Sequence, residues 1–293
     1  MTFAIDRLGS CYRAAQEYQK ARECYQQALE ITPKLVGEEE RQKQLWMAKN
    51  YHHLGIVAQE LREFAEARRN YQQALEIYLE YGARYESAGT YHQLGMVAQE
   101  LREFAEARRN YQLALEIYLE YNDRYESAGT YHQLGIVAQE LREFTEARRN
   151  YQLALEIYLE YDARYDSARI YHCLGIVAQE LRNFTEARRN YQQALEIYLE
   201  YDARYESAKT YHCLGIVAQE LREFAEAKTY YLQALEIFAE FNDEYSVTTF
   251  SLPSIARIYQ ATKDESLLAE VASLLGVTVE EVRKAFTGGD AGS

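Results

Sequence analysis

Residues 91–130 read YHQLGMVAQELREFAEARRNYQLALEIYLEYNDRYESAGT, and this stretch decides the fold. Residues 131–170 differ from it at seven of forty positions, and the dipeptide Leu-Gly recurs every forty residues from Leu54 to Leu214. A more divergent copy of the dipeptide lies at Leu8. Six repeats are therefore visible, and the sequence predicts a single structural unit that is iterated along the chain.

Each repeat carries two apolar stripes at helical spacing. The first runs through Tyr91, Leu94, Ala98 and Leu101, and the second through Phe104, Ala107, Tyr111, Ala114 and Tyr118. Steps of three and four residues place these side chains on one face of a helix. Neither helix could bury its stripe alone, so the pattern predicts an antiparallel helix pair in every repeat, joined by a turn at Arg102 and Glu103.

Small residues define the packing and the ends of these helices. Gly95 lies at the expected helix crossing, where we interpret it as a packing residue. The linker positions between repeats are all residue types that tolerate a left-handed or capping conformation. They are Gly82, Asn122, Asp162, Asp202 and Asn242.

Composition excludes several classes of function. The net charge of −14 disfavours nucleic acid and anionic membranes as partners, because both are recognised by clustered Lys and Arg. The four cysteines lie inside helical patterns, which favours reduced thiols and a cytoplasmic protein. The first residues lack a secretory signal and no stretch resembles a membrane span, so we expect a soluble protein. No phosphate-binding glycine loop or catalytic triad is recognisable, and we expect neither enzymatic activity nor a cofactor.

The repeats resemble the tetratricopeptide repeat family, in its long subclass of about forty residues. Tyr91-x-x-Leu94-Gly95-x-x-Ala98, followed by Ala107-x-x-x-Tyr111, matches the family's small and large positions in order. The resemblance implies an all-α, right-handed superhelical solenoid of antiparallel helix pairs. The first helix of each pair would line a concave groove, and the second would form the convex back.

This resemblance divides the chain into five expected segments. They are repeat one at 1–34, a connection with the start of the next helix at 35–47, five tandem repeats at 48–249, capping helices at 250–286 and a disordered tail at 287–293. Charged residues such as Glu103, Glu106, Arg108 and Arg109 are interpreted as a solvated convex face with ion pairs along the helix.

Carried onto this sequence, the resemblance places four rows of side chains in the groove, where a peptide or helix of a partner would bind. They are the histidines His52, His92, His132, His172 and His212; the glutamines Gln59, Gln99, Gln139, Gln179 and Gln219; the apolar residues Ile56, Met96, Ile136, Ile176 and Ile216; and the cations Lys49, Arg169 and Lys209. The apolar row could equally belong to the core. The family's basic clamp for a C-terminal carboxylate is absent, since His and Ile stand where it needs Lys and Asn.

The histidine row admits a second interpretation, as a metal-binding or pH-sensitive strip. We favour a copied structural residue, because no carboxylate or thiol cluster completes a metal site. Cys173 and Cys213 adjoin His172 and His212, but neighbouring residues on a helix point about 100° apart and rarely chelate together.

Three functions remain open. The first is a protein-interaction scaffold or sensor module whose groove binds a protein or peptide, either by itself or as part of a larger signalling protein. The second is a DNA-binding regulator, because residues 268–286 resemble a helix-turn-helix with Gly276 at its turn. Glu280 and Glu281, which phosphates repel, open the would-be recognition helix and favour a capping role instead. The third is a structural solenoid that self-associates end to end.

Overall fold

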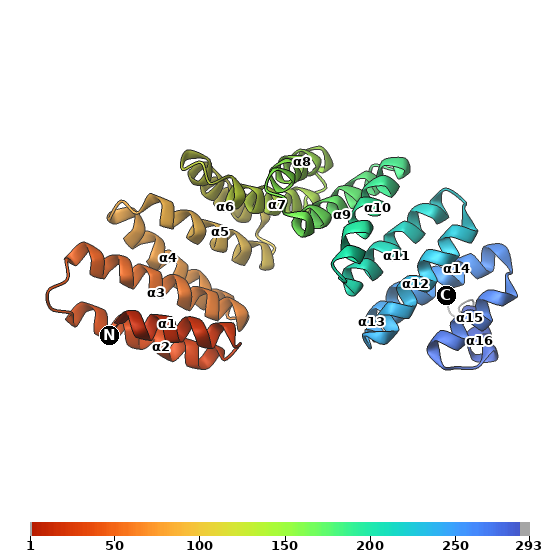
Figure 1. Ribbon diagram of the computed structural model, residues 1–293, viewed down its shortest axis with the longest axis horizontal. Coiled ribbons are helices and arrows are strands. Elements are labelled where there is room, and N and C mark those ends of the chain that lie inside the picture. The colour runs from red at the N-terminus through yellow and green to blue at the C-terminus, as the bar shows by residue number, and fades with distance from the viewer. Residues whose placement is uncertain (1, 288–293) are drawn as a thin grey trace. The chain divides into compact units, whose positions relative to one another are not determined.

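The computed structural model describes residues 2–287, with side chains from residue 4, and these residues form helices and turns only. They fall into two compact units, Met1–Asn150 and Tyr151–Ser293, and within each unit antiparallel helix pairs pack in chain order (Figure 1). We call the first helix of a pair the A helix and the second the B helix. This arrangement confirms the all-α solenoid of helix pairs that the sequence predicts.

The helix bounds follow the repeat closely. The A helices are α1 (Thr2–Ala14), α3 (Glu40–Glu60), α5 (Arg84–Glu100), α7 (Arg124–Glu140), α9 (Arg164–Glu180) and α11 (Arg204–Glu220). The B helices are α2 (Tyr18–Ile31), α4 (Phe64–Glu80), α6 (Phe104–Glu120), α8 (Phe144–Glu160), α10 (Phe184–Glu200) and α12 (Phe224–Glu240). A short 3₁₀ turn, η1 (Thr32–Lys34), follows α2, and α3 begins inside the connection expected at residues 35–47.

Left-handed residues end the helices at both kinds of turn. Between A and B helices, Arg102 has a φ of 60°, and the amide of Glu103 donates to the carbonyl of Ala98 over 2.8 Å. The guanidinium of Arg102 lies 5.6 Å from the centre of the Phe104 ring. The left-handed conformation expected at the linkers is confirmed, since all five positions have positive φ. These are Gly82, Asn122, Asp162, Asp202 and Asn242.

The core of each repeat forms where a glycine meets a buried tyrosine. A Cβ atom on Gly95 would lie 2.6 Å from the ring of Tyr111, which is fully buried. Ala98, Ala107 and Tyr111 pack with Leu134 and Val137 of the next A helix. The predicted packing role of Gly95 is confirmed, and each repeat completes its core only with the repeat that follows.

The second unit ends in a helical cap. After α12 come α13 (Glu244–Ser246), the π-helical segment η2 (Val247–Ser251), α14 (Leu252–Thr262), α15 (Glu265–Leu275) and α16 (Val279–Thr287). Leu267, Leu268, Val271, Val282 and Phe286 join the buried cluster of Tyr231 and Leu235. The last helices thus cover the apolar face of the final repeat. Apart from Thr287, the expected tail at 287–293 lies outside the described residues.

Candidate partner-binding face

In both units the four predicted rows lie on the A helices, on the side we call the A face. The cations Lys49, Arg169 and Lys209 are exposed there, while most members of the other rows are only partly exposed. His132 differs from its row, because its side chain is buried. The A face is therefore a surface of partly buried amide, imidazole and apolar groups with a few exposed cations.

The histidines tie consecutive repeats together. Nδ1 of His52 lies 3.0 Å from Oγ1 of Thr90, and Nδ1 of His92 lies 3.1 Å from Oγ1 of Thr130. The same bond joins His172 and Thr210 over 3.1 Å in the second unit. Each of these threonines belongs to the A helix of the following repeat, so these three histidines link neighbouring repeats.

The threonines also fix which nitrogen carries the proton. The hydroxyl of Thr130 donates to the carbonyl of Glu126 over 3.0 Å, and that of Thr210 donates to Glu206 over 2.8 Å. A hydroxyl has one proton, so each threonine must accept from the histidine. Nδ1 of His92 and His172 is consequently the donor, and Nε2 is left as the acceptor.

Burial keeps these imidazoles neutral. It lowers the pKa of His52, His92, His172 and His212 from 6.5 to about 4, because a charged ring would lose its hydration. Each ring also lies against the tyrosine of its own repeat, with 5.2 Å between the centres of His92 and Tyr111. Within residues 4–287, no group of three or more His, Cys, Asp and Glu side chains is placed to hold a metal ion.

The glutamine and apolar rows also contact the core. The hydroxyl of Tyr111 donates to Oε1 of Gln99 over 3.1 Å, and the bond recurs at Gln59, Gln179 and Gln219. Met96 packs partly buried against the core cluster that contains Tyr111. Ile56, Ile176 and Ile216 do the same in their repeats. The apolar row therefore contributes to the core of each repeat and is also partly exposed on the A face.

The cations and thiols of the A face differ in what they contact. Lys49 pairs with Asp6 over 2.7 Å, and Arg169 lies 3.6 Å from Asp166. Burial raises the pKa of Cys173 and Cys213 to about 11, so both thiols stay protonated at neutral pH. Neither thiol is suited to nucleophilic or metal-binding chemistry.

A pocket of about 470 Å³ lies on the A face of the second unit. Three predicted residues, His172, Lys209 and His212, line it. Cys213 lines it as well, and sequence reasoning missed the remaining walls, which are Tyr205, Phe238, Asp243, Tyr245, Ser246 and Phe250. The available signal was the loss of the repeat pattern after Tyr245.

Comparison with known families decides what kind of solenoid this is. The family model for the tetratricopeptide repeat matches five overlapping stretches, at residues 1–80, 46–120, 86–160, 126–200 and 166–240. The chain belongs to the tetratricopeptide repeat family. No curated protein matches it in sequence.

Solved structures with a similar fold include other tetratricopeptide repeat proteins. RapI in its apo form is 19% identical, with a TM-score of 0.67, and the match covers 98% of this chain and 99% of RapI. A signal transduction ATPase with a tetratricopeptide repeat sensor from Pyrococcus horikoshii is 17% identical, with a TM-score of 0.67 over 97% of this chain and 46% of that one. BtubC from P. vanneervenii is 20% identical, with a TM-score of 0.65 over 77% of this chain and 92% of BtubC. At these identities the likeness concerns the fold alone.

The B helices of the tetratricopeptide repeats carry ion pairs, but these do not run along one helix as the sequence predicts. Arg68 pairs with Glu103, Arg108 with Glu143 and Arg188 with Glu223. In each case the arginine lies on a B helix and the glutamate lies at the A-to-B turn of the next repeat. The charges therefore join neighbouring repeats, because the stacking of repeats brings these positions together.

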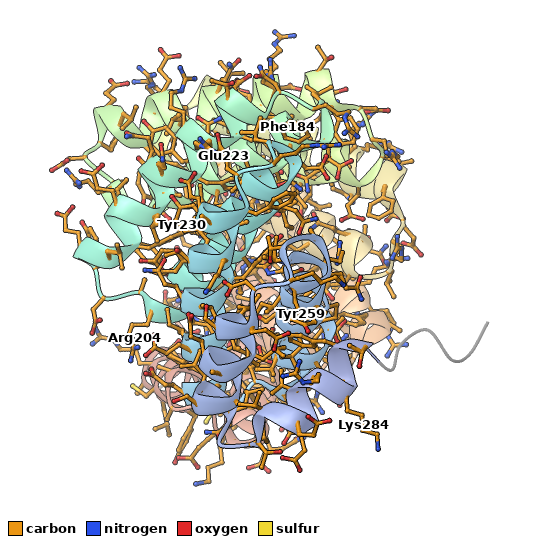
Figure 2. The ribbon with its side chains drawn as sticks, turned by 90° about the vertical axis from the view of Figure 1, so that its right-hand side faces the viewer. Phe184, Arg204, Glu223, Tyr230, Tyr259 and Lys284 are labelled. Carbon is orange, nitrogen blue, oxygen red and sulfur yellow. The ribbon has the colours of Figure 1, made fainter. Side chains whose placement is uncertain are left out.

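The segment that resembles a helix-turn-helix forms α15 and α16, with Gly276 left-handed between them at a φ of 66°. Arg283 pairs with Glu265 over 2.8 Å and with Glu280 over 3.5 Å. Lys284 extends outward from α16 (Figure 2). Glu281 accepts from the amide of Thr278 and so caps α16. Arg283 and Glu281 thus stabilise α15 and α16 themselves, which favours the capping role.

None of the helices within residues 2–287 combines the length and the apolar character that crossing a bilayer requires.

Proposed function

We propose that the chain is a protein-interaction module that holds an extended segment or a helix of a partner on its A face and performs no catalysis itself. The observation that carries this proposal is the pocket that joins His172, Lys209 and His212 to a wall of aromatic side chains. Tetratricopeptide repeats are in general interaction scaffolds, and one structurally similar chain is a Rap protein complexed with Competence and Sporulation Factor.

The chemistry of the A face supports a polypeptide as the ligand. Oε1 of Gln59, Gln99, Gln179 and Gln219 accepts from a tyrosine, which leaves the amide N–H groups of these four glutamines to donate to a partner. Nε2 of His92 and His172 is an acceptor, as derived above from their bonds to threonine. A surface with both donors and acceptors beside apolar side chains suits the backbone and side chains of a bound segment. On the B helices, Arg68, Arg108 and Arg188 are instead paired with glutamates at the turns of the next repeat.

The test compares the two faces with matched changes of charge. Peptides are selected from a random phage-displayed library against the full chain, and their affinity is measured by fluorescence anisotropy. The A-face variant carries Gln93→Glu, Gln133→Glu and Lys209→Glu. The control carries Arg69→Gln, Arg109→Gln, Arg149→Gln and Arg189→Gln, all at exposed positions of B helices. Both variants change the net charge by the same amount.

We expect the A-face variant to bind the selected peptides at least about tenfold more weakly, which corresponds to about 1.4 kcal/mol, and the control to bind within about twofold of the parent. Far-ultraviolet circular dichroism verifies that both variants are folded. Equal losses in the two variants, or a larger loss in the control, would show that the A face is not the binding surface.

A further inference from the structure

The forty-residue pattern shifts by one position in the second unit. In α11 the buried positions include Leu214, Val217 and Ala218, whereas in α14 they are Ile255, Ile258 and Tyr259, one residue beyond the repeat spacing. Side-chain contacts shift in the same way, because Tyr191 contacts Cys213 but Tyr231 contacts Ser254. The π-helical segment η2 accommodates the extra residue, and such segments are frequent at functional sites.

This shift leaves two polar atoms without partners. Phe250 lies forty positions after Thr210, at the repeat spacing, and Ser251 takes the place of Thr210 in the shifted register. Nδ1 of His212 and Oγ of Ser251 are both buried, and neither has a hydrogen-bond partner among the described residues. The Phe250 ring instead lies 5.9 Å from the centre of the His212 ring. Buried polar atoms are rarely unpaired, so this break in the pattern requires an explanation.

The pocket on the A face lies at this break, and its walls are aromatic. Tyr245 stands edge-on to Phe250 with 5.6 Å between ring centres, although its side chain is 68% exposed. Cys213 lines the pocket at a position that glutamine occupies in α5 and α7, as Gln93 and Gln133. The smaller cysteine leaves space that the glutamine side chain would take. An exposed aromatic wall around such a space is characteristic of a site that receives an apolar side chain.

The pocket holds one cation, Lys209, and one carboxylate, Asp243. Lys209 lies with its ammonium 4.4 Å from the centre of the Tyr205 ring, and it makes no ion pair with any residue from 4 to 287. Asp243, the carboxylate of the pocket, already accepts from the Tyr205 hydroxyl over 2.7 Å and from the Ser246 amide over 3.0 Å. Arg257, on α14, adds positive potential at His212. Hydrogen bonds from Ser246 and Tyr205 and, to a smaller extent, the charge of Lys209 lower the pKa of Asp243. Lys209 forms no ion pair with that carboxylate, so its ammonium can pair with a carboxylate of a ligand.

We propose that this pocket receives an aromatic side chain from a segment within a partner's chain, and that an aspartate or glutamate next to that aromatic residue pairs with Lys209. The inference rests on the proposed function, because it takes the A face to be the surface that holds the segment. A volume of about 470 Å³ is within the range of sites that enclose a small ligand, and it accommodates a large ring. The cation of the pocket would then fix the register of the segment in the groove.

Three single substitutions test this proposal with peptides selected from the random library against the full chain. Lys209→Glu reverses the charge that pairs with the carboxylate. Cys213→Gln fills the pocket with the side chain that other repeats carry at this position, so the fold is expected to tolerate it. Arg189→Glu makes the same charge reversal at an exposed position of the B helix α10, outside the A face, and serves as the matched control. Each selected peptide is also synthesised with its acidic residue changed to the corresponding amide.

We expect the selected peptides to share an aromatic residue adjacent to Asp or Glu. Lys209→Glu and Cys213→Gln should each weaken binding at least about tenfold, and Arg189→Glu should weaken it less than about threefold. The amide peptides should lose their sensitivity to Lys209→Glu. Peptides without this pair, or full affinity in the Lys209→Glu variant, would overturn the inference. The proposed function would still stand if the combined A-face variant lost binding. Failure to select any peptide would overturn both.

Discussion

Two glycines of α5 allow the packing of the repeat to be tested within a single helix. A Cβ atom on Gly95 would lie 2.6 Å from the ring of Tyr111, whereas the nearest atom to a Cβ atom on Gly89 is the Tyr118 hydroxyl oxygen, at 3.7 Å. Replacing either glycine by alanine improves helix propensity by about 1 kcal/mol. That gain is common to both variants, so the difference between them isolates the steric cost at Gly95.

The magnitude at Gly95 follows from the immobility of Tyr111. The tyrosine is fully buried and its hydroxyl is bonded to Gln99, so the ring cannot move aside without breaking that bond. Overpacking in such a core costs about 1–3 kcal/mol, and we expect the upper end of that range. Gly89→Ala should stabilise the chain by about 1 kcal/mol, and Gly95→Ala should be about 3 kcal/mol less stable than Gly89→Ala.

Urea unfolding followed by circular dichroism at 222 nm measures both variants against the parent chain. Equal slopes of the free energy of unfolding against urea concentration would show that the variants expose the same surface area when they unfold, so their midpoints can be compared directly. If Gly95→Ala proved as stable as Gly89→Ala, the tyrosine would not be packed against the glycine as described, and the explanation of the repeat core would be wrong.

Three further predictions follow from the same contacts. The histidines have folded pKa values near 4 and ordinary values near 6.5, so their contribution to stability is complete above pH 6.5 and is lost as the pH falls toward 4. At pH 5 each histidine should lower the free energy of unfolding by about 2 kcal/mol, because its imidazole is protonated in the unfolded chain but not in the folded one. A urea midpoint that does not change between pH 7 and pH 5 would contradict this. Thr130→Val removes the acceptor for Nδ1 of His92 and should destabilise the chain by about 1–3 kcal/mol in urea unfolding. An unchanged free energy of unfolding would show that this bond does not stabilise the stacking of the two repeats. Because Arg283 is already paired with Glu265 and Glu280, duplex DNA should show no salt-dependent binding in anisotropy titrations at low ionic strength, and clear binding would revive the DNA-binding alternative.

The fold could be predicted from the sequence because repetition makes every structural requirement visible several times. Gly95 and Tyr111 recur at fixed positions, and so do the linker residues that the structure places at positive φ. A single unit would have left the helix-pair assignment open, but identical spacing in successive units requires them to stack on one another. The ion pairs between repeats were missed, because pairing along one helix considers only neighbours in sequence.

The rows of the A face could be predicted as positions but not as contacts. Nothing in the spacing indicates that His92 reaches Thr130, because that bond depends on the distance between successive A helices. The loss of the repeat pattern after Tyr245 marked the place of the pocket, but its walls could not be predicted, for a related reason. The π-helical segment η2 contains one extra residue, so every later residue moves by one position relative to the forty-residue spacing. Only the buried positions of α14 show that the core contacts continue in this shifted register.

Photo-crosslinking locates a bound segment on one face most directly. A benzophenone amino acid is placed at Gln93, Gln133 or Lys209 on the A face, or at Arg109 or Arg149 on the B helices, and each protein is irradiated with a selected peptide. Adducts from the A-face positions alone are the predicted result. Adducts from the B-helix positions, with none from the A face, would contradict the proposal that the A face holds the partner.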